Sequence, residues 1–177
     1  LSQAQGDPTT LLVALADDGD TDVRAAAAWA LSATGDSGAS GPQLLSLVGN
    51  ETDPGVRARL YQALENQDGL DSNTLLAAVR NEQDPTARIA ALDLLAHALR
   101  ENPTPELENF FEQTAIPQLR QIALSGGDSQ TRMSAVIALA RGNNLSAQTA
   151  LREIGQTSAD PKIRNAADSA IGILAKK

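Results

Sequence analysis

The stretch DPKIRNAADSAIGIL, residues 160–174, has the pattern of a capped amphipathic helix. Asp160 is suited to cap the N-terminus, Pro161 suits the first helical position, and Arg164 follows on the next turn. The same opening, an Asp followed four residues later by an Arg and then by Ala and Leu at helical spacing, recurs upstream. The chain is therefore built from copies of one unit.

Five Asp and Arg pairs mark the copies: Asp20 and Arg24, Asp53 and Arg57, Asp84 and Arg88, Asp128 and Arg132, and Asp160 and Arg164. From Arg to Arg the spacings are 33, 31, 44 and 32 residues, which is typical of stacked helical repeats. The third, sixth and seventh residues after each Arg are apolar and share one helix face. A shorter apolar segment precedes each capped helix. This pattern predicts an all-α fold, an alpha-alpha superhelix of five helical hairpins with about ten helices.

We expect a single solenoid domain over residues 1–177. Its predicted repeats are approximately 7–36, 37–69, 70–102, 103–143 and 144–177. The spacing of 44 residues is the longest and indicates an insertion within 103–117.

Two prolines delimit the expected helices of this insertion. Pro105 predicts a helix over 105–112, and Pro117 predicts a break or kink, with a second helix from about Ala115. Phe110 and Phe111 either pack on the neighbouring repeat or form a lid or docking knob, because aromatic residues are enriched at binding hot spots.

The D-P-x-V-R-like opening followed by A-x-x-A-L resembles the HEAT repeat, in particular its phycobilin-lyase type, over nearly the whole chain. The resemblance implies that the Asp and Arg side chains of the five pairs form a hydrogen-bonded ladder between neighbouring repeats. An N-cap contributes about 1 kcal/mol, whereas an exposed pair four residues apart contributes only about 0.3–0.5 kcal/mol. The cap accounts for each Asp, and the ladder supplies the reason for each Arg.

By the same resemblance, the second helices line the concave face of the stack. Their exposed positions are then the first, second, fifth and ninth after each Arg, with Tyr61 at the edge of this strip. Trp29 has an alternative interpretation, in which it packs against the next helix. The candidate partner-binding residues are Trp29, Arg59, Tyr61, Gln62, Ile89, Asp93, Met133 and Ile137.

Composition and motifs argue against several classes of function. A formal charge of -8 with scattered Arg residues and no basic stripe excludes nucleic acid as the expected partner. With one histidine, His97, and no cysteine, the chain lacks paired metal-binding motifs and a nucleophile–base set. The acidic stretch ADDGDTD has no closing Glu of a calcium loop. We therefore expect no catalytic residues, no metal site and no cofactor.

These observations favour a non-enzymatic scaffold that binds a protein or peptide on its concave surface. Two alternatives remain: a subunit of an enzyme such as a bilin-lyase-like chromophore-attachment factor, or an architectural domain of a larger protein. The apolar front TTLLVALA, residues 9–16, predicts that a preceding segment or a partner covers it.

No membrane insertion is expected, because the chain contains no run of 18 apolar residues. Three Lys beside many Gln, Asn, Ser and Thr residues favour an exported or periplasmic bacterial protein over a cytoplasmic one.

Overall fold

The computed structural model describes residues 13–33, 41–67 and 70–175, and this part of the chain is helical without a strand. It divides into two compact units, an N-terminal unit, Leu1–Leu94, and a C-terminal unit, Leu95–Lys177. The predicted all-α fold of helical hairpins is confirmed. None of the described helices is both long enough and apolar enough to cross a membrane.

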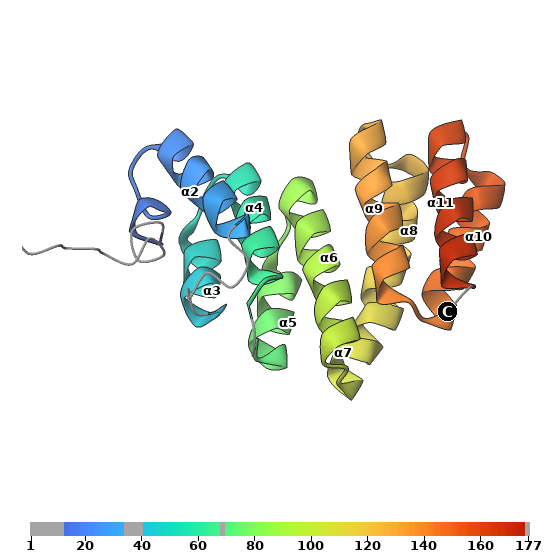
Figure 1. The fold of residues 1–177 in the computed structure, drawn as a ribbon, viewed down its shortest axis with the longest axis horizontal. Helices are drawn as coiled ribbons and strands as arrows, with labels where there is room; N and C mark the ends of the chain where they lie inside the picture. Colours follow the sequence, from blue (N-terminus) through green and yellow to red (C-terminus); the bar gives the residue numbers. More distant parts are fainter. Residues whose placement is uncertain (1–12, 34–40, 68–69, 176–177) are drawn as a thin grey trace, which may run out of the picture. The chain divides into compact units, whose positions relative to one another are not determined.

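The N-terminal unit stacks its helices in two layers (Figure 1). Residues 13–15 are helical and lead through a turn into the second helix of the first hairpin. That helix, α2, packs beside α4, while α3 packs on α4 and touches α5. The helices of this unit are α2 (Thr21–Ala33), α3 (Gly41–Asn50), α4 (Pro54–Leu64), α5 (Ser72–Asn81) and α6 (Pro85–Glu101), which continues into the next unit.

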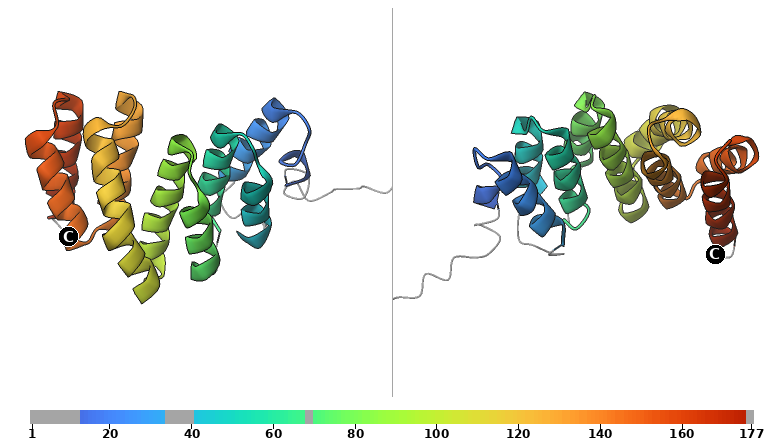
Figure 2. Two further views of the ribbon diagram at one scale, coloured as in Figure 1. Left: turned by 180° about the vertical axis from the view of Figure 1, so that it is seen from behind. Right: turned by 90° about the horizontal axis from the view of Figure 1, so that it is seen from above.

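The C-terminal unit repeats this arrangement. The second helices α9 and α11 lie side by side, α8 lies beside α10, and each hairpin pairs one helix from each layer (Figure 2). The helices are α7 (Pro105–Phe110), a π-helix η1 (Phe111–Ala115), α8 (Ile116–Ser125), α9 (Ser129–Gly142), α10 (Leu145–Thr157) and α11 (Pro161–Leu174).

Side-chain caps start most helices, as the sequence predicts. The carboxylate of Asp53 accepts the N–H of Val56 at 3.0 Å, and that of Asp128 accepts the N–H of Thr131 at 2.7 Å. Asp160 accepts the N–H of Lys162. Each bond satisfies a backbone donor that the first helical turn leaves without an intrahelical acceptor.

The predicted helix break at Pro117 is not observed. The chain is helical from residue 105 to 125, and the π-helical turns of η1 lie immediately before the proline. There the N–H of Ile116 donates to the carbonyl of Phe111, five residues back. In an α-helix, Pro117 would lack its own donor and its ring would collide with the carbonyl of Gln113. The wider π turn relieves this conflict without interrupting the helix.

The core is made mostly of Ala and Leu, with Tyr61 and Phe111 as its largest fully buried side chains. Phe111 is packed against Gly142 of α9, so closely that a Cβ at Gly142 would overlap the phenyl ring. Its packing partner therefore belongs to its own repeat, and its burial excludes it as a docking knob. Phe110 is half-buried.

Candidate functional site

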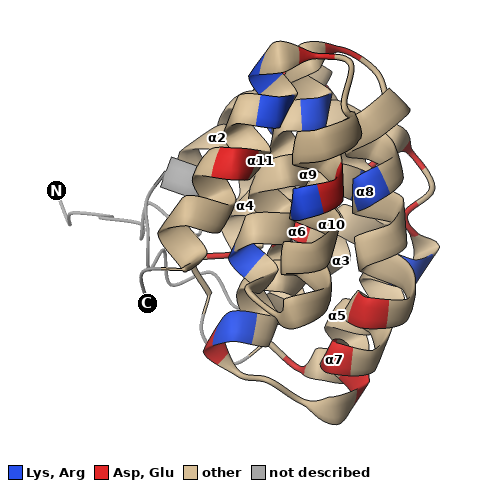
Figure 3. Ribbon diagram, turned by 90° about the vertical axis from the view of Figure 1, so that its right-hand side faces the viewer, with Lys and Arg blue, Asp and Glu red and all other residues tan. Residues whose placement is uncertain are grey.

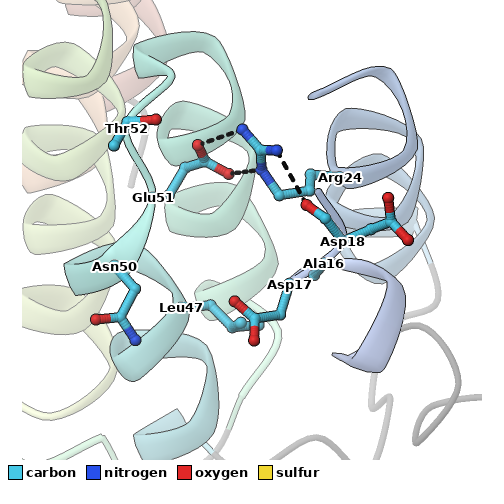
Figure 4. A pocket seen from close by; sticks show the side chains of 8 residues that line it. All are labelled: Ala16, Asp17, Asp18, Arg24, Leu47, Asn50, Glu51 and Thr52. Carbon is cyan, nitrogen blue, oxygen red and sulfur yellow. Dashed lines mark hydrogen bonds and ion pairs between the residues drawn. The ribbon is translucent and has the colours of Figure 1, made fainter. Parts of the chain in front are cut away.

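Arg24 joins two hairpins of the N-terminal unit. Its Nε and Nη2 atoms donate to the two carboxylate oxygens of Glu51, at 2.6 and 3.0 Å, in a bidentate pair (Figure 4). Its Nη1 atom donates to the carbonyl of Asp18, at 3.0 Å, in the turn before its own helix. One guanidinium thus fixes both its own turn and the next hairpin.

Arg57 makes the same set of bonds one repeat later. Its Nε and Nη2 atoms donate to Glu82 at 2.8 and 3.1 Å, and its Nη1 atom donates to the carbonyl of Glu51 at 3.1 Å. The side chains of Glu51 and Glu82 are only 2% and 4% exposed. The acceptors of this ladder are therefore buried glutamates, and the predicted pairing of Arg with the Asp of the next repeat is wrong for these two rungs.

The ladder acids share one position, two residues before the capping Asp. There the acid also accepts the N–H of that Asp, at 2.8 Å for Glu51 and Asp53 and at 2.9 Å for Glu82 and Asp84. Aligning the five copies at this position would have revealed them, since it gives Asp18, Glu51, Glu82, Gly126 and Ser158.

In the C-terminal unit the predicted Arg-to-Asp pairing occurs once. Arg132 contacts the carboxylate of Asp160 at 3.1 Å. Arg164 donates to the carbonyl of Ser158, as the other repeat arginines bond their own turns. A further rung connects the first helices α8 and α10, where Arg120 pairs with Glu153.

The remaining repeat arginine, Arg88, bonds to backbone carbonyls of its own hairpin. Its Nη1 atom donates to the carbonyl of Glu82 at 3.2 Å and to the carbonyl of Val79. Burial lowers the pKa of this guanidinium, and the nearby Tyr61 and Glu82 oppose the effect.

Electrostatics favour the ionised form of the rung between Arg24 and Glu51. Burial alone would raise the pKa of Glu51, but the bonds from Arg24 and from the N–H of Asp53 outweigh it and lower the pKa. Burial, together with the Glu82 carboxylate, raises the pKa of Tyr61 well above its ordinary value. The Tyr61 hydroxyl lies 3.5 Å from a carboxylate oxygen of Glu82, to which it donates a long hydrogen bond.

Two hollows flank the ladder acids of the N-terminal unit. One of about 220 Å³ lies beside Arg24 and Glu51 and is lined by Asp17, Leu47 and Asn50 among others (Figure 4). The second, of about 500 Å³, lies beside the rung that Glu82 forms. Their walls mix aliphatic, amide and carboxylate groups.

Four of the predicted partner-binding residues are open to solvent on the second helices. Trp29 is 58% exposed and Ile137 is 49% exposed. Arg59 and Gln62 are also exposed, whereas Asp93 and Met133 are half-buried. Ile173 of α11, at the ninth position after its Arg, is a further exposed apolar side chain. We refer to Trp29, Arg59, Gln62, Met133, Ile137 and Ile173 as the second-helix face of their respective units.

Two of the predicted residues, Tyr61 and Ile89, are buried instead. Leu92 and Ala96, three and seven residues further along α6, share the helix face of Ile89 and are also buried, so α6 buries a second face besides the predicted one. Tyr61 occupies the fourth position after its Arg, which is buried in the first four copies and exposed only at Asp168 in the last. The assignment of both residues to a binding surface is therefore wrong.

Charged side chains are dispersed along the described helices without a continuous basic stripe (Figure 3). Among the described residues, no group of three or more His, Cys, Asp or Glu side chains is placed to hold a metal ion.

The repeat architecture agrees with a comparison of the whole chain with protein families. A family model described as HEAT repeats matches residues 3–65 and 72–172. The match is to HEAT repeats in general and does not extend to the phycobilin-lyase type. No curated protein matches the chain.

Proposed function

Because the chain belongs to the HEAT-repeat family, we propose that it is a non-enzymatic scaffold that binds a protein or peptide through its second-helix face. HEAT repeats are commonly protein-interaction scaffolds. The observation that carries the proposal is the exposure of Trp29 on a helix whose opposite side is fully buried. Trp and Arg are the residue types most enriched at binding hot spots, and Arg59 belongs to the face of the same unit.

The ladder supports this proposal by holding the face in place. Trp29 follows Arg24 by five residues on α2, and Arg24 is fixed at both its own turn and the next hairpin. A side chain on a fixed helix loses less entropy on binding than one on a mobile loop. The C-terminal unit offers its own part of the face, with Ile137 on α9 and Ile173 on α11.

The proposal is tested by capturing partners from an extract of the source cell with immobilised wild-type chain and with matched variants. We expect Trp29→Ala or Ile137→Ala to lose at least one protein that the wild type retains. Arg152→Ala, an exposed change on the first helix α10, serves as the control and should retain that protein. Equal retention by all variants would overturn the proposal, provided that circular dichroism shows unchanged helicity.

A further inference from the structure

A hollow of about 500 Å³ lies between the first helices α3 and α5 of the N-terminal unit. Its aliphatic walls are Leu45 and Val48 on α3 and Ala77 and Ala78 on α5. A Cβ at Gly49 of α3 would meet nothing within 4 Å, so the space beside this residue is open. Pockets that hold ligands have volumes of roughly 300–1,000 Å³, so the hollow is large enough for a guest.

The C-terminal unit fills the same place with its own side chains. Counted back from the repeat arginines, Leu45 on α3 corresponds to Arg120 on α8, and Ala77 on α5 corresponds to Glu153 on α10. Arg120 donates to Glu153 at 2.6 Å across those two helices. By the same count, Gly49 and Ala78 correspond to Leu124 and Ile154. At each of these four positions the N-terminal unit has the smaller residue, which leaves the space between its first helices open.

A buried hydroxyl lines this hollow. Tyr61 is only 1% exposed, whereas the corresponding residue of the C-terminal unit is the apolar Val136. The hydroxyl lies 3.5 Å from the carbonyl of Ala78 and 3.5 Å from a carboxylate oxygen of Glu82, so both bonds that it can donate are long. None of the residues that the structure describes donates to its oxygen. A phenolic oxygen can also accept, so Tyr61 favours a guest that donates hydrogen bonds.

The charged groups of the lining also favour a donor. They are the carboxylates of Glu51, Glu82 and Asp84 and the guanidinium of Arg57. Arg57 already donates through all three of its nitrogen atoms, to Glu82 and to two backbone carbonyls. Arg88, which lies close to Tyr61, donates to backbone carbonyls of its own hairpin. Because carboxylates outnumber guanidinium groups in the lining, a cationic guest is complementary to it and an anionic guest is not.

We infer that the hollow binds the side chain of a lysine from a protein partner. The methylene groups of the lysine pack between Leu45 and Ala77, and its ammonium group donates to the hydroxyl oxygen of Tyr61. Lysine fits better than arginine, because both oxygens of Glu82 already hold Arg57. A guanidinium binds best to the two oxygens of one carboxylate, whereas the three N–H groups of an ammonium can reach acceptors on separate residues.

The open rim of the hollow favours a protein partner over a free amine. Gly49 on α3 and Thr74, Ala77 and Asn81 on α5 line the hollow and are exposed. A free amine would bury only part of its surface there. Its loss of translational freedom would not be offset by the contacts that the residues around a lysine make with α3 and α5. The site lies on first helices and is separate from the second-helix face.

The test titrates the labelled protein with the peptide acetyl-Gly-Lys-Gly-amide at constant ionic strength and follows amide chemical shifts by NMR. We expect shifts at Gly49, Ala77 and Ala78 that are several-fold larger than those caused by the norleucine peptide, which has the aliphatic chain without the ammonium group. Arginine and glutamate peptides should also give the smaller response. Equal shifts with lysine and norleucine, or larger shifts with arginine, would overturn the inference. An equal response to n-butylammonium chloride would overturn it in favour of a free amine.

Matched variants test the location of the site. Gly49→Leu introduces the side chain that the C-terminal unit has at Leu124 and should abolish the response to the lysine peptide. Gly172→Leu is the control, because both glycines are exposed helical residues whose added Cβ meets nothing within 4 Å. Tyr61→Phe keeps the ring and should reduce the lysine response toward that of norleucine. A response that persists in Gly49→Leu, with unchanged helicity by circular dichroism, would overturn the inference. Trp29→Ala should leave the response unchanged, so this inference and the proposed function fail independently.

Discussion

At the scale of single residues, two carboxylates of the N-terminal unit are almost removed from solvent. Glu51 and Glu82 each hold a guanidinium bidentately and also accept the N–H of a capping Asp. A buried charge is stable only while its bonding partners remain. Removing one partner therefore lowers the free energy of unfolding by more than the intact pair adds to it in net terms.

Replacing Glu82 by Ala should destabilise the chain by about 2–4 kcal/mol, because Arg57 would stay largely buried without its carboxylate. The matched control is Glu101→Ala, which removes the partner of Arg100 in a pair whose side chains are 52% and 59% exposed. That change should cost much less than Glu82→Ala, because solvent screens an exposed ion pair. Urea denaturation followed by circular dichroism measures both, and equal losses would contradict the assignment of a buried rung.

The lowered pKa of Glu51 makes part of this stability dependent on pH. Since the folded-state pKa lies below the ordinary value of 4.5, the contribution is complete above pH 4.5 and is lost as the pH falls through the folded-state pKa. In Glu51→Gln, the free energy of unfolding should fall less steeply over this acidic range than in the wild type. Denaturant titrations at a series of pH values measure the two slopes, and parallel curves would show that Glu51 is not the group responsible.

At the scale of helices, sequence reasoning succeeds where the interaction is local. The caps of Asp53, Asp128 and Asp160 act within a few residues, so an Asp before a helical pattern is sufficient to predict them. The rung from Arg24 to Glu51 joins residues 27 apart, and an Arg alone does not identify its acceptor. The burial of Ile89 depends on what covers the other sides of α6, which helical periodicity does not record.

The π-helix is a second feature that the sequence pattern does not fully predict. Pro117 correctly indicates that an α-helix cannot continue unchanged, but it does not tell whether the chain breaks, kinks or widens. In the structure the turns before the proline widen, and Phe111 within them is buried in the core against α9.

Gly142→Ala should destabilise the C-terminal unit by about 1–3 kcal/mol, because the new methyl group would overlap the buried ring of Phe111. Gly172→Ala is the matched control, since a Cβ there meets nothing within 4 Å. In the exposed part of α11 it should be neutral or stabilise by up to about 1 kcal/mol, because Ala favours helix more than Gly. Thermal unfolding distinguishes the two, and a neutral Gly142→Ala would show that the Phe111 ring can move aside.

At the scale of the whole molecule, repetition in sequence does not give every repeat the same coupling. The N-terminal unit contains the rungs to Glu51 and Glu82, and the C-terminal unit contains those to Glu153 and Asp160. In the fourth copy the ladder-acid position is Gly126, which has no side chain to offer. Each of these four rungs joins residues of one unit, and in repeat proteins stability is approximately a sum of such local terms.

This division predicts that damage to one unit stays local. Glu82→Ala should speed hydrogen exchange at the amides of α3, α4 and α5 and leave those of α10 and α11 at wild-type rates, because the rung that it breaks joins α4 to the end of α5, both in the N-terminal unit. Gly142→Ala should give the converse pattern. Exchange measured by NMR under native conditions reports both at individual amides. If Glu82→Ala speeds exchange equally in both units, the chain unfolds as one cooperative body, and the local ladder does not set its stability.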